Sequence, residues 1–356
     1  MRESAGNATP HGSPLVHGIA TLNPSYFALV MATGIVSTAC QLMDVRWLAL
    51  SLFWLNIAAY VVLVLLTGAR LAMFPRAFFA DLIDHKRGVG FFTLVAATCV
   101  LGSQSLQIGN ARGAAVALWC VGSVLWLVLT YTIFTSLSVK ETKPLLQDGI
   151  HGGWLVSVVA AQSVSLLGGL LAEGFGPYRE QVLFFALVMW LGGGMLYIWI
   201  ISLIFYRYTF FPMSPADLSP PYWINMGAMA ISTVAGTVLI SVANESAVLG
   251  QVLPFLKGFT LFYWATATWW IPMLVILGVW RHVYKRFQLR YDPQYWGVVF
   301  PLGMYTVSTV RLARAIDLPF LLVIPECVIY VAFAAWLLTF GAMLHSLMTL
   351  LWKRVP

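Results

Sequence analysis

The sequence predicts an all-α integral membrane protein with ten transmembrane helices, and three observations support that fold class. First, the chain of 356 residues is 60% hydrophobic and only 9% charged, whereas a soluble domain carries about 25% charged residues. A single core cannot bury so much apolar surface, so lipid must act as the solvent. Second, apolar stretches of about 20 residues, the length of a membrane-crossing helix, recur along the chain. Third, segments rich in small residues return at a regular interval.

The small-residue segments recur five times, every 64 to 76 residues. Their cores read MATGIVSTA (31–39), VAATCVLGS (95–103), VAAQSVSLLG (159–168), GAMAISTVAG (227–236) and GMYTVSTV (303–310). Each core is followed by a more apolar and aromatic segment. Because an internal repeat fixes the architecture, five such pairs suggest an inner ring of helices inside an outer ring. An inner ring encloses an axis, and an axis through a membrane suggests a pore.

In chain order, we expect helices at 25–43, 47–67, 88–108, 113–136, 152–172, 181–206, 223–243, 255–281, 295–315 and 319–350. The odd-numbered members of this series carry the small-residue cores, and the even-numbered members are the bulky partners. Residues 1–21 are expected to form a short polar cytoplasmic tail. No linker or low-complexity tract interrupts the remainder, so residues 22–356 are expected to form a single ten-helix transmembrane domain.

The basic residues predict the orientation of these helices. Fourteen of the 20 Lys and Arg residues fall on the tails and loops that share a side with the amino terminus, and six fall on the other side. The positive-inside rule therefore places both termini in the cytoplasm of a multi-pass protein of the inner or plasma membrane. The net charge of +7 is explained by these loops and their contact with anionic lipid, so no nucleic-acid partner is expected.

Small and hydroxyl-bearing residues of the inner helices are candidates for lining a pore. Hydroxyl groups donate hydrogen bonds to an anion without adding a fixed charge that would trap it. The alternative is that these residues let helices approach closely, which is their commonest use in membranes. The candidates are Thr33, Gly34, Ser37, Thr98, Ser103, Ser163, Ser232, Thr233, Gly303 and Thr306.

The ninth expected helix carries the most specific local pattern. Pro301 has no N–H to donate to the carbonyl of Gly297, so a kink is expected there. Phe300 precedes this proline, and a phenyl ring at that point of a pore-lining helix would plug a narrow pore and gate it by excluding water. The alternative is that Phe300 is one of 22 phenylalanines that pack against a neighbour.

Few ionisable residues lie at membrane depth. Proton-coupled transporters usually carry intramembrane acids or histidines, and here the candidates for proton coupling are Glu326 and His345 in the tenth helix. A structural role for Glu326 at the membrane surface is the alternative. The chain has no HExxH, GxSxG or Gly-rich phosphate-binding pattern, so we expect no enzyme activity, no cofactor and no metal site.

Three segments together resemble one known family. NPSYFALVMATGIVS (23–37), PPYWINMGAMAISTVAG (220–236) and VFPLGMYTVSTVRLA (299–313) are similar to the tellurite-resistance/C4-dicarboxylate transporter family, which includes plant slow anion channels, fungal malate permeases and sulfite exporters. The resemblance implies five helical hairpins around a quasi-fivefold pore lined by the odd-numbered helices. It also implies a homotrimer with one pore per subunit, and a gate formed by Phe300 beside Pro301.

The predicted function is therefore transport of small anions through a pore gated by Phe300. Candidate anions are C4-dicarboxylates such as malate, sulfite, chloride, nitrate and tellurite, and membrane lipid is the other expected partner. The alternative within transport is a proton-coupled carrier or exporter of dicarboxylate or sulfite that uses Glu326 or His345. An intramembrane enzyme would need convergent catalytic residues, and a structural scaffold would need no polar-lined axis.

Overall fold

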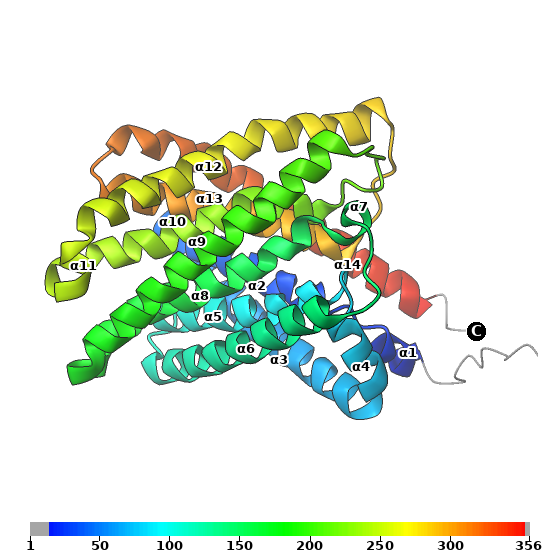
Figure 1. Cartoon of the computed structure of the whole chain (residues 1–356), viewed down its shortest axis with the longest axis horizontal. Helices are drawn as coiled ribbons and strands as arrows, with labels where there is room; N and C mark the ends of the chain where they lie inside the picture. Colours follow the sequence, from blue (N-terminus) through cyan, green and yellow to red (C-terminus); the bar gives the residue numbers. More distant parts are fainter. Residues whose placement is uncertain (1–13, 353–356) are drawn as a thin grey trace, which may run out of the picture.

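The computed structural model describes residues 14–352, and every regular element in that range is a helix. Ten of these helices have 15 or more residues, and they form a single bundle (Figure 1). They are α2 (Ala28–Leu42), α3 (Arg46–Met73), α5 (Phe92–Gln107), α6 (Arg112–Val139), α8 (Val156–Leu171), α9 (Arg179–Phe210), α10 (Ile224–Ser241), α12 (Leu253–Val279), α13 (Trp296–Ala315) and α14 (Val323–Trp352). Each lies where the sequence predicts a helix.

The small-residue helices contact one another in a closed cycle. In chain order, α2 packs on α5, α5 on α8, α8 on α10, α10 on α13, and α13 returns to α2. Each of these inner helices also packs against the long helix that follows it in the chain, namely α3, α6, α9, α12 or α14. Of the apolar membrane-length stretch that contains α10, 94% of the residues are buried, whereas in α6 the share is 17%. The two sets of helices therefore form an inner and an outer layer.

One glycine lies at each of the five contacts of the inner cycle. A Cβ at any of these positions would come within 3 Å of a side chain on the next inner helix. The pairs are Gly34 with Val100, Gly102 with Leu167, Gly169 with Val238, Gly227 with Pro301, and Gly303 with Ile35. Small residues let membrane helices approach closely, and here they close the cycle.

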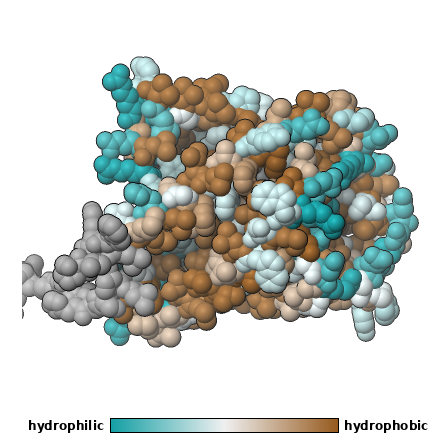
Figure 2. Space-filling view, turned by 180° about the vertical axis from the view of Figure 1, so that it is seen from behind, coloured by the Kyte–Doolittle hydropathy of each residue, from teal (hydrophilic) through white to brown (hydrophobic). Residues whose placement is uncertain are grey.

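Eight helical segments in the described range are long and apolar enough to cross a membrane. One of them, residues 152–210, contains both α8 and α9, which Gly176 separates with a φ of 52°. Helix α13, which contains Tyr305, Thr306 and Arg311, is not among the eight. Figure 2 shows a broad hydrophobic band over the middle of the bundle, with hydrophilic residues gathered toward both ends.

The remaining helices are short and lie at the ends of the long ones. Helices α1 (Pro14–Ala20) and α4 (Pro75–Leu82) both contact α3. Helix α7 (Leu146–Gly149) leads toward α8, and α11 (Ala247–Gln251) precedes α12. Part of the tail predicted for residues 1–21 is thus helical, and residues 1–13 lie outside the described range. Figure 1 places α1 and the last turn of α14 at the same end of the bundle.

Candidate functional site

Each inner helix begins with a short 3-10 turn. The turns are η1 (Pro24–Phe27), η2 (Gly88–Phe91), η3 (Gly152–Leu155), η5 (Pro220–Trp223) and η8 (Pro293–Tyr295). Every turn contains an aromatic residue at the corresponding position, namely Tyr26, Phe91, Trp154, Tyr222 and Tyr295. The five turns also contact each other in a closed cycle, in the same order as the helices that follow them. The amino-terminal ends of all five inner helices therefore meet at one end of the bundle.

A cavity of about 160 Å³ lies inside this cycle of turns. Its wall has two layers, and each inner helix contributes one residue to each layer. The first layer consists of Ser25, Gly90, Gly153, Pro221 and Gln294, and the second, three residues later on every helix, of Ala28, Thr93, Val156, Ile224 and Gly297. Residues three apart lie on the same face of a helix, so the repeat presents one face of each helix to the cavity.

The floor of the cavity is not symmetric. Three residues further along the inner helices, only Met31 and Phe300 still line the cavity. Their side chains are 2% and 1% exposed. The corresponding residues on the other three inner helices are smaller, namely Ala96, Val159 and Gly227. Two bulky apolar side chains, from the neighbouring helices α2 and α13, therefore close the inner end of the cavity. Helix α13 continues through Pro301, and the proline ring packs against Gly227.

Side-chain caps hold three of the five turns. Oδ1 of Asn23 accepts a hydrogen bond from the N–H of Ser25 at 3.0 Å, and Oδ1 of Asp292 accepts one from Gln294 at 2.8 Å. Nδ1 of His151 accepts from the N–H of Gly153 at 3.1 Å. Each cap satisfies one amide of a helix start. The starts of all five helices face the cavity, and the positive ends of their dipoles favour an anion there.

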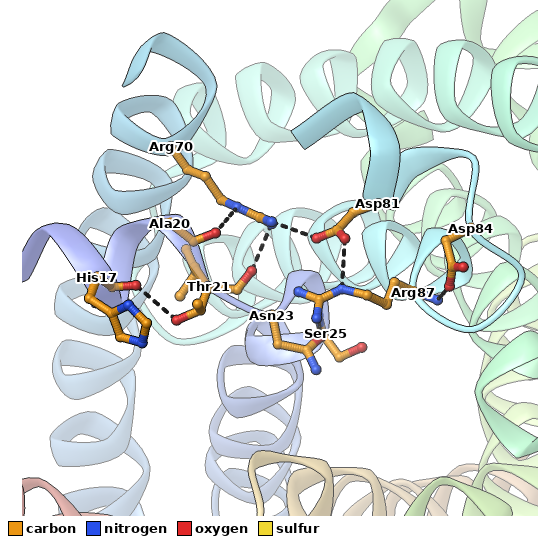
Figure 3. A network of polar contacts seen from close by, with 10 residues as sticks. His17, Ala20, Thr21, Asn23, Ser25, Arg70, Asp81, Asp84 and Arg87 are labelled. Carbon is orange, nitrogen blue, oxygen red and sulfur yellow. Dashed lines mark hydrogen bonds and ion pairs between the residues drawn. The ribbon is translucent and has the colours of Figure 1, made fainter. Parts of the chain in front are cut away.

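A network of ion pairs places Arg87 at the rim of the cavity (Figure 3). Asp81 bridges two arginines, with Arg70 Nη2 at 2.6 Å from one carboxylate oxygen and Arg87 Nε at 2.9 Å from the other. Arg70 also donates to the carbonyls of Ala20 and Leu22, which ties α3 to the chain just before η1. Lys86 lines the same cavity. Two cations thus stand at a cavity that already favours negative charge.

His151 is an uncharged hydrogen-bond donor in the wall of this cavity. Burial lowers the pKa of His151 to about 4, so the imidazole is neutral at physiological pH. Because Nδ1 accepts from Gly153, the ring proton lies on Nε2. That nitrogen is buried without a hydrogen-bond partner, and the residue lines the cavity. It is available to donate to a bound anion.

The ten predicted pore-lining residues lie outside the wall of this cavity, and their lining of a pore further along the axis stays a prediction. Three hydroxyl groups bond to outer helices: Thr33 accepts from Trp336 Nε1 at 3.0 Å, Thr98 lies 2.9 Å from the Tyr60 hydroxyl, and Ser37 donates to the carbonyl of Ala49 at 2.7 Å. Ser103, Ser163, Ser232, Thr233 and Thr306 each donate to a carbonyl one turn earlier on their own helix. Gly34 and Gly303 lie in the helix contacts described above. None of these ten residues lines the cavity.

The two candidates for proton coupling lie on the outer layer. Glu326 and His345 are both exposed on α14, and neither lines the cavity. Within residues 14–352, no group of three or more His, Cys, Asp or Glu residues is arranged to hold a metal ion.

Sequence reasoning missed the opening turns, although a signal for them is present. The aromatic residue and its neighbours repeat as PSYF, VGFF, GGWL, PPYW and PQYW, just before the five small-residue segments. Aligning the five turns gives the two layers of the cavity wall directly. It also places Phe300 on the cavity-facing side of its helix, with Met31 as its counterpart.

Comparison with known proteins identifies the class. Residues 21–344 match the SLAC1 family, described as voltage-dependent anion channel, so the chain belongs to that family, as the three motifs predicted. An uncharacterized membrane protein of Mycobacterium tuberculosis is 43% identical over 152 residues, which is 43% of this chain and 77% of the relative.

Two further relatives extend over most of the chain. An uncharacterized transporter of Methanocaldococcus jannaschii is 26% identical over 336 residues, covering 90% of this chain and 92% of the relative. A sulfite efflux pump, SSU1, of Arthroderma benhamiae is 21% identical over 350 residues, covering 92% and 91%. The chain is thus a multi-helix membrane protein, and both the family and these relatives support transport of anions.

Proposed function

We propose that this protein conducts small anions across the cell membrane along the axis of the inner helices. The observation that carries the proposal is the cavity at which five helix starts converge, with Lys86, Arg87 and His151 in its wall. Positive helix ends, two cations and a neutral donor concentrate anions. The apolar side chains of Phe300 and Met31 then form the constriction through which an anion must pass.

The mechanism follows from the contrast between the wall and the floor of this cavity. An anion enters a polar vestibule, where backbone N–H groups and side-chain donors replace part of its water. At the floor it meets two apolar side chains with no donor, and a hydrophobic constriction of this kind blocks ions by excluding water. Rotation of the Phe300 side chain away from the axis would open the path. Gating by Phe300 is thus part of the proposal.

The proposed arrangement in the membrane has all ten long helices crossing the bilayer around a quasi-fivefold axis. Both termini lie in the cytoplasm, so the vestibule opens to the cytoplasmic side, where the basic loops lie. The membrane is the inner or plasma membrane, and the family resemblance suggests a homotrimer with one pore per subunit. Sulfite is a candidate substrate because a relative is named a sulfite efflux pump. Malate, nitrate, chloride and tellurite remain candidates that the flux measurement distinguishes.

A proton-coupled carrier is a weaker candidate. Its coupling residues would be Glu326 and His345, which are exposed on an outer helix, away from the vestibule. A carrier built on them would need a substrate path outside the inner helices. Uptake driven by a pH gradient and lost in Glu326→Gln would favour the carrier.

The test is anion flux into proteoliposomes at clamped voltage, with and without a pH gradient, for wild type and Phe300→Ala. We expect a flux that follows voltage, ignores the pH gradient and rises at least tenfold in the variant. Phe92→Ala is the matched control, since Phe92 is equally buried on an inner helix but packs against Phe134 outside the cavity. A folded Phe300→Ala protein that conducts no better than wild type would overturn the gate. Flux that requires the pH gradient would overturn the channel.

A further inference from the structure

Arg311 lies on the same face of α13 as Phe300, toward the opposite end of the inner helices. The two residues are eleven positions apart, and at 3.6 residues per turn eleven positions return to within about 20° of the same direction, roughly 16 Å further along the helix. Met304 and Val307 lie between them on this face, and both are buried. The face that closes the vestibule with a phenyl ring therefore ends in a guanidinium group.

The contact that Arg311 makes crosses the inner cycle. Its Nη2 donates to Oε1 of Gln107 at 2.6 Å, and Gln107 is the last residue of α5. Helix α13 packs on α2 and α10, whereas α5 packs on α2 and α8. The hydrogen bond thus joins two inner helices that are not neighbours in the cycle. It connects the carboxyl-terminal ends of these helices, at the end of the axis that lies away from the vestibule.

The guanidinium group is poorly satisfied in this position. Of its five N–H groups, one has the bond to Gln107, and Nε is enclosed with no hydrogen-bond partner. Among the ion pairs formed by residues 14–352, none involves Arg311, whereas Arg70, Arg179 and Arg207 each face a carboxylate. Arg311 is half-buried, and a charge removed from water without a counter-charge is destabilising. The negative ends of the inner-helix dipoles account for a cation here, but they leave the buried Nε–H group without an acceptor.

We propose that Arg311 and Gln107 form a second anion site, at the end of the conduction path opposite the vestibule, and that this site favours oxyanions. The inference rests on the proposed function. A guanidinium group presents two parallel N–H groups to the two oxygens of a nitrate, sulfite or carboxylate. A chloride ion offers no second acceptor atom for that geometry. The anion displaces the Gln107 carbonyl oxygen from Arg311, and rotation of the amide lets its NH₂ donate to the anion.

The experiment compares nitrate and chloride, two monovalent anions, in flux assays on proteoliposomes with wild type and Arg311→Lys. Lysine keeps the charge and removes the paired donors. We expect the nitrate-to-chloride flux ratio to fall about tenfold in Arg311→Lys. Arg314→Lys is the matched control, because Arg314 is exposed at the end of the same helix, and its ratio should equal that of wild type. An unchanged ratio in Arg311→Lys would overturn the inference.

A second variant protects the test against misfolding. Gln107→Glu has the same shape and places a carboxylate 2.6 Å from the guanidinium nitrogen that the glutamine now contacts. The resulting ion pair should occupy Arg311, lower nitrate flux more than chloride flux and raise the melting temperature of the purified protein. Gln107→Glu protein that is more stable but keeps the wild-type flux ratio would overturn the inference while the proposed function stands. Wild-type protein that conducts neither anion would overturn both.

Discussion

The inner and outer helices differ in how regularly their glycines make helix contacts. At Gly34, Gly102, Gly169, Gly227 and Gly303, one for each contact of the inner cycle, an added Cβ would come within 3 Å of a side chain on the next helix. The outer layer is mixed. Gly68, Gly258, Gly278 and Gly341 have no such atom within 4 Å, whereas Gly122, Gly193 and Gly194 each face a side chain of a neighbouring helix. Glycine is thus a packing requirement at every contact of the inner cycle, whereas in the outer layer it is required at some positions and replaceable at others.

This difference explains why the inner helices surround an axis at all. Because the five contacts are made through glycine, the backbones approach closely enough to bury the inner helices almost completely. The cavity lies at the start of these helices, inside the cycle of 3-10 turns. A path for ions then requires side chains to move at the floor of the cavity. Separate substitutions at the floor, at the glycine contacts and at the rim test whether these three regions contribute independently to flux and stability.

The largest effect is expected at the floor. Met31→Ala combined with Phe300→Ala removes both bulky side chains from the constriction, so flux should exceed that of Phe300→Ala alone and respond only weakly to voltage. The reason is that the floor would then consist of small side chains on all five helices. Single-channel recording in planar bilayers measures this directly. A double variant with the flux of Phe300→Ala would show that Met31 is part of the packing and not of the gate.

The next effect tests the glycine contacts. Gly227→Ala places a Cβ 2.6 Å from Cγ of Pro301 and 3.2 Å from its Cα, and a rigid proline ring cannot turn aside. Overpacking of this kind costs about 1–3 kcal/mol, so the melting temperature of the purified protein should fall. Gly258→Ala in α12 is the control. With open space around it, the new methyl group should raise helix stability by up to about 1 kcal/mol. Equal melting temperatures for the two variants would contradict the assignment of Gly227 to a helix contact that has no room for a methyl group.

The extent to which the sequence predicts these features differs between fold and site. The helices and their inner and outer pairing follow from hydrophobicity and small-residue content, because both properties are averages over a segment. Which way a given side chain points does not follow, since an inner helix is buried on every side. Thr33 and Thr98 bond to outer helices, and Gly34 and Gly303 fill contacts, although the same residues were candidates for lining a pore.

At the floor of the cavity, by contrast, the sequence does single out a residue that lines it. The neighbouring Pro301 and a family resemblance single out Phe300, and the structure adds its partner Met31, which emerges from the sequence only when the five opening turns are aligned. The rim was missed for a different reason. Lys86, Arg87 and His151 lie just before opening turns that are too short and irregular for periodicity to detect, and only the folded structure brings them to one cavity.

A smaller effect concerns pH and the cap of η3. Burial lowers the pKa of His151 from 6.5 to about 4, so the unfolded chain takes up a proton at a higher pH than the folded protein does. Stability contributed by neutral His151 is therefore complete above about pH 6.5 and declines as the pH falls toward 4. His151→Asn keeps a cap of the kind that Asn23 provides for η1 and removes the titration. Between pH 7 and pH 5, the melting temperature should fall less in this variant than in wild type. An equal fall in both proteins would contradict the assignment of the lowered pKa to His151.

The smallest expected effect is at the rim, where solvent screens charge. Arg87→Gln removes one cation from the vestibule and leaves Asp81 paired with Arg70. Because Arg87 attracts anions over a distance and does not close the path, flux should drop about two- to threefold at low ionic strength and approach the wild-type value near 1 M salt, where the screening length is about 3 Å. Flux measured at two salt concentrations separates this from a change at the floor, which salt would not reverse. A loss that persists at high salt would mean that Arg87 binds the anion directly, and the vestibule would then hold a fixed site in place of a diffuse positive potential.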